Sequence, residues 1–169
     1  GAIHGSGKRL LELINNILDL SKVEAGKLDL RESDIPVAGA VEDCLRLFDS
    51  QLENAGLTLT VTGSDDRLCL IADRQMFERI LMNLVSNAIK FTPHGGRIEV
   101  RTARGPGGGL QLAVADTGVG VAKADIGTAM SPFGQVESLL TRKHQGTGLG
   151  LPLSRILVEK HGGARTSER

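Results

Sequence analysis

Residues 73–92, DRQMFERILMNLVSNAIKFT, predict one amphipathic helix around which the rest of the chain can be arranged. Asp73 is suited to cap the N-terminus of this helix. At about 100° per residue, its apolar side chains fall on one face, which is wide enough to be buried against a sheet. The residues of this face are Phe77, Ile80, Leu81, Leu84, Val85 and Ala88.

A second face of the same helix carries polar residues in a pattern that a ligand would explain. These residues are Arg79, Asn83, Ser86, Asn87 and Lys90. Asn83 and Asn87 lie one turn apart, although Asn is a poor residue for a helix interior. Lys90, further along, indicates that the ligand is anionic. On spacing alone, an ordinary solvated polar face explains the same residues.

Composition indicates one domain with a sizeable core and an appendage. The chain has 169 residues, of which 40% are hydrophobic and 24% charged. Twenty basic and twenty acidic residues cancel, so no overall field favours nucleic acid or an anionic membrane surface. With four Phe, no Trp and no Tyr, a base-stacking platform is not expected.

Targeting and redox signals are few. No apolar run approaches the ~18 residues of a membrane span and no signal peptide is evident. We therefore expect a soluble, cytoplasmic chain with no membrane contact of its own, although a longer parent protein could be membrane-anchored. Cys44 and Cys69 stand among apolar neighbours and are predicted to be small core residues in a reducing compartment.

The first residues of the chain predict a bundle helix. Apolar residues between 3 and 20 follow the spacing of a and d positions, with further apolar residues that widen the stripe. A stripe of this kind needs a partner helix or a second subunit to cover it. Gly26 is expected to end the helix, and residues 27–31 to form a short strand.

A second helix is predicted before the period of the apolar residues changes. The sequence Asp34-Ile35-Pro36 is a helix-start signal, and apolar residues at helical spacing continue to about Asn54. Gly56 is expected to close this helix. Its buried residues are predicted to be Val37, Val41, Leu45, Phe48 and Leu52.

From residue 57 the apolar period is two. Leu57, Leu59 and Val61 alternate with threonines, which predicts a strand with one buried face. Residues 68–72 predict a second strand that leads into the central helix.

Two further strands flank a glycine-rich turn. Residues 98–100 and 110–114 alternate in the same way on either side of residues 105–109, which predicts a hairpin. Hairpin strands with helices from both halves of the chain on one face predict an α/β two-layer sandwich.

Two glycine-rich segments suggest ligand contacts. Asp116 follows a strand and precedes Gly118 and Gly120, so a flat ring could approach the backbone there while the carboxylate accepts a hydrogen bond from an amine. An ordinary Asx turn explains this segment equally well. Residues 146–150, GTGLG, lead into a helix whose N-terminus could bind phosphate oxygens.

Taken together, these segments resemble the N, G1, F and G2 boxes of sensor histidine kinases. The order is Asn83-x-x-x-Asn87-x-x-Lys90, Asp116-x-Gly118-x-Gly120, Phe133, and Gly146-x-Gly148-x-Gly150. The flanks are similar too: LINNILDLSKVEAGKLDL resembles the end of the dimerisation helix, and SPFGQVESLLTRKHQGTGLGLPLSRILVEKHGG the lid and final helix. The resemblance implies the Bergerat-type ATP-binding fold that this family shares with gyrase-type and chaperone ATPases. It also implies a boundary, with residues 1–26 in the dimerisation region and residues 27–169 in the ATP-binding domain.

Carried over by position, the resemblance assigns a role to each motif residue. Asn87 would bind Mg²⁺ with help from Asn83, and Lys90 would contact phosphate oxygens. Asp116 would accept the adenine amino group. The remaining assignments are Gly118 and Gly120 lining the ring, Phe133 packing the lid, Arg142 or Lys143 neutralising charge, and Gly146, Thr147, Gly148, Leu149 and Gly150 holding the phosphates of ATP.

The resemblance also implies an activity and its partners. Related ATPases carry a Glu at position 83 that can activate water, whereas Asn83 has no basicity, so we expect ATP to be used for phosphoryl transfer. In the family the acceptor is a histidine on a preceding helix, and His4 lacks the expected motif, so this chain alone should not autophosphorylate. The partners would be a second copy, through the first helix, and the receiver domain of a response regulator.

Two alternatives to a histidine kinase stay open at this point. A kinase-like regulatory scaffold would bind nucleotide weakly or not at all. An ATPase of the chaperone or mismatch-repair type is disfavoured by Asn83 and by the bundle helix. The family also continues past residues 161–163, HGG, into two closing strands, so the domain is expected to be truncated at its C-terminus.

Overall fold

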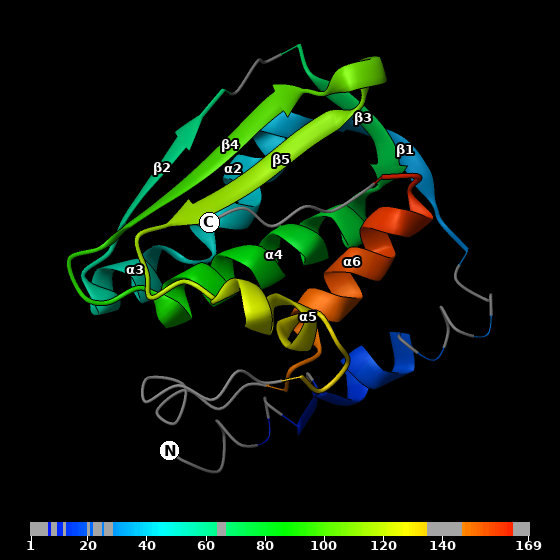
Figure 1. The fold of residues 1–169 in the computed structure, drawn as a ribbon. Coiled ribbons are helices and arrows are strands. Elements are labelled where there is room, and N and C mark those ends of the chain that lie inside the picture. The colour runs from blue at the N-terminus through cyan, green and yellow to red at the C-terminus, as the bar shows by residue number, and fades with distance from the viewer. Residues whose placement is uncertain are drawn as a thin grey trace. The chain divides into compact units, whose positions relative to one another are not determined.

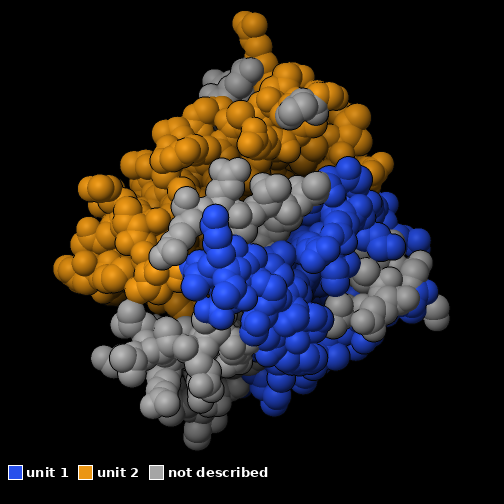
Figure 2. Space-filling view, in the orientation of Figure 1, with its two compact units in different colours: residues 1–30, 121–168 blue, residues 31–120, 169 orange. Residues whose placement is uncertain are grey.

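The computed structural model describes residues 29–63, 67–134 and 147–163, and residues 7, 10, 11, 13–19, 21 and 25 of the N-terminal segment. The chain divides into two compact units, drawn in different colours in Figure 2. Unit 1 comprises residues 1–30 and 121–168, and unit 2 comprises residues 31–120 with residue 169. The predicted boundary between residues 26 and 27 stays a prediction.

Unit 2 is built on helix α4 (Arg74–Phe91), which is the central helix predicted from the sequence (Figure 1). Its apolar face is buried through Phe77, Ile80, Leu81, Val85 and Ala88, whereas Leu84 is half-buried. Helix α4 contacts α2 (Val37–Arg46) and α3 (Asp49–Ala55) and also packs against strands of both sheets. One core therefore joins the helical layer to the strands.

The strands of unit 2 form two sheets. Strands β1 (Glu32–Pro36) and β3 (Cys69–Asp73) pair antiparallel. The other sheet has the order β2-β4-β5, with β2 (Thr58–Thr62) parallel to β4 (Arg97–Arg104) and β4 antiparallel to β5 (Leu110–Asp116). The β4–β5 hairpin turns through the short 3₁₀ helix η1 (Pro106–Gly108), as predicted. The prediction of an α/β two-layer sandwich is confirmed.

The prediction for residues 34–54 was wrong in two respects. The expected helix start at Asp34-Ile35-Pro36 lies in strand β1, because Ile35, which is 0% exposed, pairs with Leu70 of β3 and joins the core. The strand that was expected at residues 27–31 lies instead at residues 32–36. Residues 29–31, which are the part of the expected range that the structure describes, are not in a strand.

The single helix expected up to residue 54 is also divided. The N–H groups of Leu47 and Phe48 bond to the carbonyl groups three residues before them, which tightens the turn and ends α2 before α3 begins. The five residues predicted to be buried are nevertheless all buried, and Gly56 closes α3 in the left-handed conformation, as predicted.

Two burial predictions failed at the edges of the sheets. Val61 is 42% exposed because β2 is the outermost strand of its sheet among the described residues. Cys69 is exposed because it lies opposite Pro36 on the outer face of the β1–β3 pair, whereas Cys44 is buried as expected.

Unit 1 contains the N-terminal segment, the segment after β5 and the last helix. Among the described residues of the first helix, Leu10, Leu11, Ile14, Ile17 and Leu18 are exposed, so most of the predicted apolar stripe is uncovered. After residue 120 come the 3₁₀ helix η2 (Lys123–Asp125) and α5 (Ile126–Ala129), and α6 (Gly150–Lys160) is the last helix of the described residues. Within the described residues, no helix is both long and apolar enough for a membrane span.

Candidate functional site

The polar face of α4 is the first part of the candidate site. Asn83, Asn87 and Lys90 are all half-buried, on a helix whose apolar face is anchored in the core. Within the described part of the chain, the Asn87 amide makes no hydrogen bond, so its oxygen is available to a ligand. The Lys90 ammonium lies over the Phe91 ring, 4.8 Å from the ring centroid, which keeps the charge near the end of the helix.

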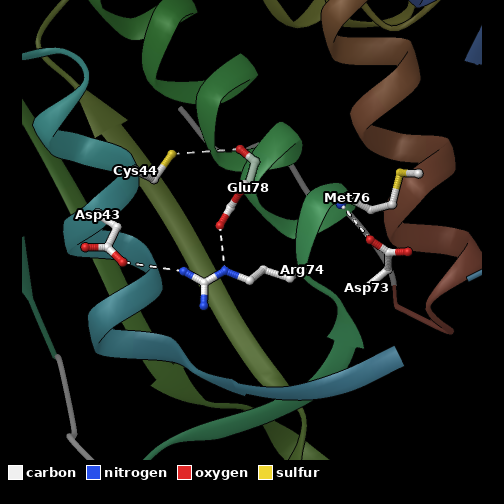
Figure 3. A network of polar contacts seen from close by, with 6 residues as sticks. All are labelled: Asp43, Cys44, Asp73, Arg74, Met76 and Glu78. Carbon is white, nitrogen blue, oxygen red and sulfur yellow. Dashed lines mark hydrogen bonds and ion pairs between the residues drawn. The ribbon is translucent and has the colours of Figure 1, made fainter. Parts of the chain in front are cut away.

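The N-terminal end of α4 is fixed by side chains that are not part of this face (Figure 3). Asp73 accepts a hydrogen bond from the Met76 N–H at 3.1 Å and another from the Arg31 N–H at 2.9 Å. Arg74 bonds to Glu78 at 2.8 Å and pairs with Asp43 of α2 at 3.4 Å. The direction of the helix is therefore set at the end opposite to Lys90.

Asp116 lies at the end of the inward-facing row of β5. It pairs with Ile98, which is 0% exposed, and directly opposed residues of two strands project to the same face of the sheet. Leu112 and Val114 precede it in this row and pack against the core. The Asp116 carboxyl group is itself exposed, so it stands on the helix side of the sheet where the core ends.

The turn after Asp116 is packed against the C-terminal end of α4. One carboxylate oxygen of Asp116 accepts a hydrogen bond from the Gly118 N–H at 2.8 Å, which is the Asx turn considered in the sequence analysis. The Val119 N–H donates to the Phe91 carbonyl at 3.4 Å. A Cβ at Gly118 would lie 2.5 Å from this carbonyl oxygen, so only glycine permits the approach. Asp116 thus has one oxygen committed to the turn and a second that can serve a ligand.

In unit 1, the GTGLG segment is packed against the segment around Phe133. Gly148 has φ +68°, and a Cβ there would lie 2.9 Å from the Phe133 carbonyl carbon and 3.0 Å from the Gly134 oxygen. Phe133 itself adopts φ +61°, which is uncommon outside glycine. Its ring is 60% exposed, and the backbone makes the contact with Gly148. That Phe133 packs the lid stays a prediction.

Helix α6 begins directly after this contact. Leu149 precedes the first residue of the helix and is buried, as are Leu153 and Leu157 one and two turns later. The Leu149 N–H lies 3.4 Å from the Thr147 hydroxyl oxygen. No acidic residue occupies the first turn of α6, so its positive dipole end is not neutralised there. Such an N-terminus is suited to phosphate oxygens.

The sequence-predicted site residues therefore fall into two sets. Unit 2 holds Asn83, Asn87, Lys90, Asp116, Gly118 and Gly120, connected through the contact between Phe91 and the turn after β5. Unit 1 holds Phe133, Thr147, Gly148, Leu149 and Gly150. Arg142, Lys143 and Gly146 lie outside the described residues. That the two sets line one cleft stays a prediction.

Sequence reasoning missed two threonines next to the site. Thr92 is buried, and its hydroxyl donates to the Ala88 carbonyl at 2.6 Å, which satisfies an end carbonyl of α4. Thr117 accepts the Arg97 N–H at 2.9 Å through its hydroxyl. The position of Thr92 before Pro93 is a helix-stop signal that could have indicated the first contact, but the second depends on strand register.

The donor set fits a magnesium ion that is held mainly by a ligand. No cluster of His, Cys, Asp and Glu that could hold a metal occurs among the residues that the structure describes. The amide oxygen of Asn87 is a hard, neutral ligand, which suits Mg²⁺ when waters and phosphates supply the remaining positions. The residues present therefore fit Mg²⁺ bound together with a phosphate-bearing ligand.

Comparisons with known proteins identify the family. Residues 72–169 match the family of histidine kinase-, DNA gyrase B- and HSP90-like ATPases. The chain is 46% identical over 164 residues to the non-motile and phage-resistance protein of Caulobacter vibrioides, covering 95% of this chain and 19% of that protein. It is 42% identical over 166 residues to histidine protein kinase DivJ of the same organism, covering 98% of this chain and 28% of DivJ.

A solved structure supports the same relation. Full-length ShkA, crystallised in complex with AMPPNP, superposes with a TM-score of 0.83 at 29% sequence identity, covering 96% of this chain and 33% of ShkA. The chain thus spans 19% of the first of these relatives, 28% of DivJ and 33% of ShkA. It belongs to the family of histidine kinase-, DNA gyrase B- and HSP90-like ATPases, as a sensor histidine kinase catalytic domain.

Proposed function

We propose that this chain is the Mg²⁺·ATP-binding core of a sensor histidine kinase that passes the γ-phosphoryl group of ATP to a histidine outside the chain. The main support for the proposal is a contact within unit 2 between the turn after β5 and the C-terminal end of α4. The turn after Asp116 is held against the Phe91 carbonyl, at the end of the helix that bears Asn87 and Lys90. Asp116, which can accept a hydrogen bond from an amine, is thereby connected within unit 2 to the helix whose Lys90 can donate to an anion.

Each part of this site has a role suited to its chemistry. The second oxygen of Asp116 accepts a hydrogen bond from the exocyclic amino group of adenine, which guanine lacks at that position. Asn87, assisted by Asn83, supplies amide oxygen to Mg²⁺, which neutralises charge on the phosphates. Lys90 donates to phosphate oxygens. The backbone around Gly148 and the N-terminus of α6 take the remaining phosphate oxygens.

The chemistry of residue 83 favours transfer over hydrolysis. An amide cannot accept a proton from water at neutral pH, so Asn83 provides no general base for attack on the γ-phosphate. The nucleophile is then an imidazole nitrogen, which forms the new P–N bond as the bond to ADP breaks. We propose that the phosphoryl group next passes to an aspartate of a response-regulator receiver domain.

The exposed apolar stripe of the first helix is the reason to propose that a second helix covers it. Leu10, Leu11, Ile14, Ile17 and Leu18 place apolar side chains in solvent, a pattern that a second copy of the helix would cover. We propose a homodimer formed through this helix, in the cytoplasm, with no direct contact between this chain and the membrane.

A titration with a fluorescent ATP analogue tests nucleotide binding. The wild-type chain is expected to bind the analogue with Mg²⁺ and more weakly with EDTA, while hydrolysing ATP slowly. Asp116→Asn should reduce the preference for ATP over GTP, because an amide presents a donor beside its acceptor oxygen. Circular dichroism of each sample verifies that the chain is folded.

Two results would favour the other functions. A folded wild-type chain that binds no analogue at any Mg²⁺ concentration would favour a regulatory scaffold. Rapid ATP hydrolysis by the isolated chain would favour an ATPase of the chaperone or mismatch-repair type. Unchanged ATP-to-GTP discrimination in Asp116→Asn would remove the assignment of Asp116 to adenine.

A further inference from the structure

Thr117 occupies an unusual position at the end of the β4–β5 ladder. Ile98 and Asp116 are the last regular pair, so Arg97 and Thr117 are next in register. The Thr117 N–H donates to the Arg97 carbonyl at 3.0 Å, as in a regular hydrogen-bonded pair. The return bond is different: the Arg97 N–H donates to the Thr117 hydroxyl at 2.9 Å, whereas a regular ladder would use the Thr117 carbonyl.

Because the Thr117 hydroxyl accepts the hydrogen bond in place of the Thr117 carbonyl, the strand can end here without the loss of a hydrogen bond. Since the hydroxyl satisfies Arg97, the Thr117 carbonyl need not stay in the plane of the sheet. The chain can then turn at Gly118 toward the end of α4, where the Val119 N–H meets the Phe91 carbonyl. Thr117 thus completes the pairing with β4 and also allows the chain to leave the sheet.

The surroundings of the Thr117 hydroxyl are closely packed. A Cβ at Gly96 would lie 3.0 Å from this oxygen and would also collide with the methyl group of Thr92. Thr92 is bonded to the last turn of α4. The hydroxyl therefore lies where the end of α4, the start of β4 and the turn after β5 meet.

We propose that Thr117 is a positioning residue for adenine recognition: its hydroxyl fixes the turn after β5 and thereby the orientation of the Asp116 carboxylate. The inference rests on the proposed function, because it assigns adenine to Asp116. Thr117 acts through its neighbour, whose side chain is held by the Gly118 N–H of the same turn. A loosened turn would leave Asp116 in place on β5 but would broaden the range of directions of its second oxygen.

The test compares Thr117→Val, which keeps the shape but lacks the hydroxyl, with Thr117→Ser, which keeps the acceptor. Thr60→Val is the matched control, because Thr60 is an exposed strand threonine of the same sheet whose hydroxyl bonds to no described residue. Competition against the fluorescent analogue gives dissociation constants for ATP, GTP and inorganic tripolyphosphate, each with Mg²⁺. Amide hydrogen exchange without nucleotide reports on Gly118 and Val119 directly.

We expect Thr117→Val to bind ATP about tenfold more weakly, with tripolyphosphate unchanged and the ATP-to-GTP preference reduced accordingly. Exchange at Gly118 and Val119 should become faster without nucleotide, while Thr117→Ser and Thr60→Val behave as the wild type. Equal losses for ATP and tripolyphosphate, or a wild-type ATP-to-GTP ratio in Thr117→Val, would overturn the inference alone. A wild-type chain that binds no nucleotide would overturn the proposed function and the adenine role of Thr117 with it.

Discussion

The two halves of α4 use the same helix for different purposes. In the N-terminal half, Asp73 caps the helix and Arg74 pairs with α2 (Figure 3). Phe77 and Leu81 of the same half are buried. The C-terminal half retains a buried edge but exposes polar groups, and its last carbonyl, at Phe91, is bonded to the turn after β5. The N-terminal half is therefore bonded to and packed within the fold, and the C-terminal half carries the polar groups that we propose bind the ligand.

Because the two halves have different contacts, stability and ligand binding can be changed separately in this unit. A change in the N-terminal half should alter the free energy of unfolding but leave affinity unchanged in the molecules that remain folded. A change at Asn87 or Lys90, on the polar face of the C-terminal half, should do the reverse. Asparagine at positions 83 and 87 is tolerable because the other half holds the helix in place.

The largest effect is expected from Phe77→Ala in the N-terminal half. Phe77 is buried in the core, and removing its ring leaves a cavity between α4 and the sheets. The free energy of unfolding should fall by about 3–5 kcal/mol, as measured by urea denaturation. If the Phe77→Ala domain no longer folds, Phe77→Leu provides a milder change, which should lower the free energy of unfolding by about 1 kcal/mol.

The nucleotide affinity of the folded Phe77→Leu protein separates the two halves. Its dissociation constant for Mg²⁺·ATP, corrected for the unfolded fraction, should equal that of the wild type. A tenfold weaker value at full folding would mean that packing at Phe77 is transmitted along the helix, and the two halves would not be independent.

The next largest effect is expected from Asn87→Asp on the polar face. A carboxylate there adds negative charge beside the phosphates, so Mg²⁺-dependent nucleotide affinity should fall by roughly thirtyfold, or about 2 kcal/mol. The free energy of unfolding should change by less than ~0.5 kcal/mol, since Asn87 is half-buried and bonds to no described residue.

Ser86→Ala is the matched control for this change, because Ser86 is an exposed residue of the same polar face to which no ligand contact is assigned. It should leave both affinity and stability at the wild-type values. Should Asn87→Asp lower the melting temperature by many degrees, the residue would be structural and the comparison between the halves would fail at this position.

A smaller loss is expected from Asp73→Ala at the start of the helix. The substitution removes the acceptor for the Met76 N–H and for the Arg31 N–H. A lost N-cap typically costs about 1 kcal/mol, and the second lost bond should bring the total to about 2 kcal/mol at most. Asp73→Asn keeps an acceptor oxygen and should recover most of the loss in denaturant titrations.

The sequence was sufficient to predict α4, the β4–β5 hairpin and the layer architecture, because each has a regular apolar period. Asp73 was predicted as a cap because its side-chain contact is local in sequence. Strand β1, which precedes α2, was missed because Ile35 is buried through pairing with Leu70, a contact that no local pattern records.

The candidate site divides in the same way. The types and order of Asn83, Asn87 and Asp116 are visible in the sequence, and so is the need for glycine at position 118. The reason for that glycine is a contact with the Phe91 carbonyl, and the role of Thr117 depends on its register with Arg97. These are tertiary properties, so the sequence predicts the residue types but not the contacts.

The last prediction concerns Cys44 of α2, whose ionisation does not affect stability at neutral pH, because the thiol is then protonated in both the folded and the unfolded chain. Its thiol is buried, and its sulfur lies 3.9 Å from the Glu78 carbonyl in the N-terminal half of α4. Burial, with a smaller contribution from the charge of Glu78, raises the pKa of Cys44 from 9.0 to about 11. Between these values the unfolded chain releases a proton that the folded chain retains, so stability falls as the pH rises.

This loss should disappear in Cys44→Ala, which has no group to ionise. At pH 8 the variant should be less stable than the wild type because of its smaller side chain, and the difference should narrow by pH 10 in denaturant titrations. Cys69→Ala removes an exposed thiol and should show no such change. A difference that stays constant from pH 8 to 10 would contradict the prediction. Because the Cys44 thiol contacts α4 at Glu78, in the N-terminal half, nucleotide affinity of the folded protein should not follow the stability across this range.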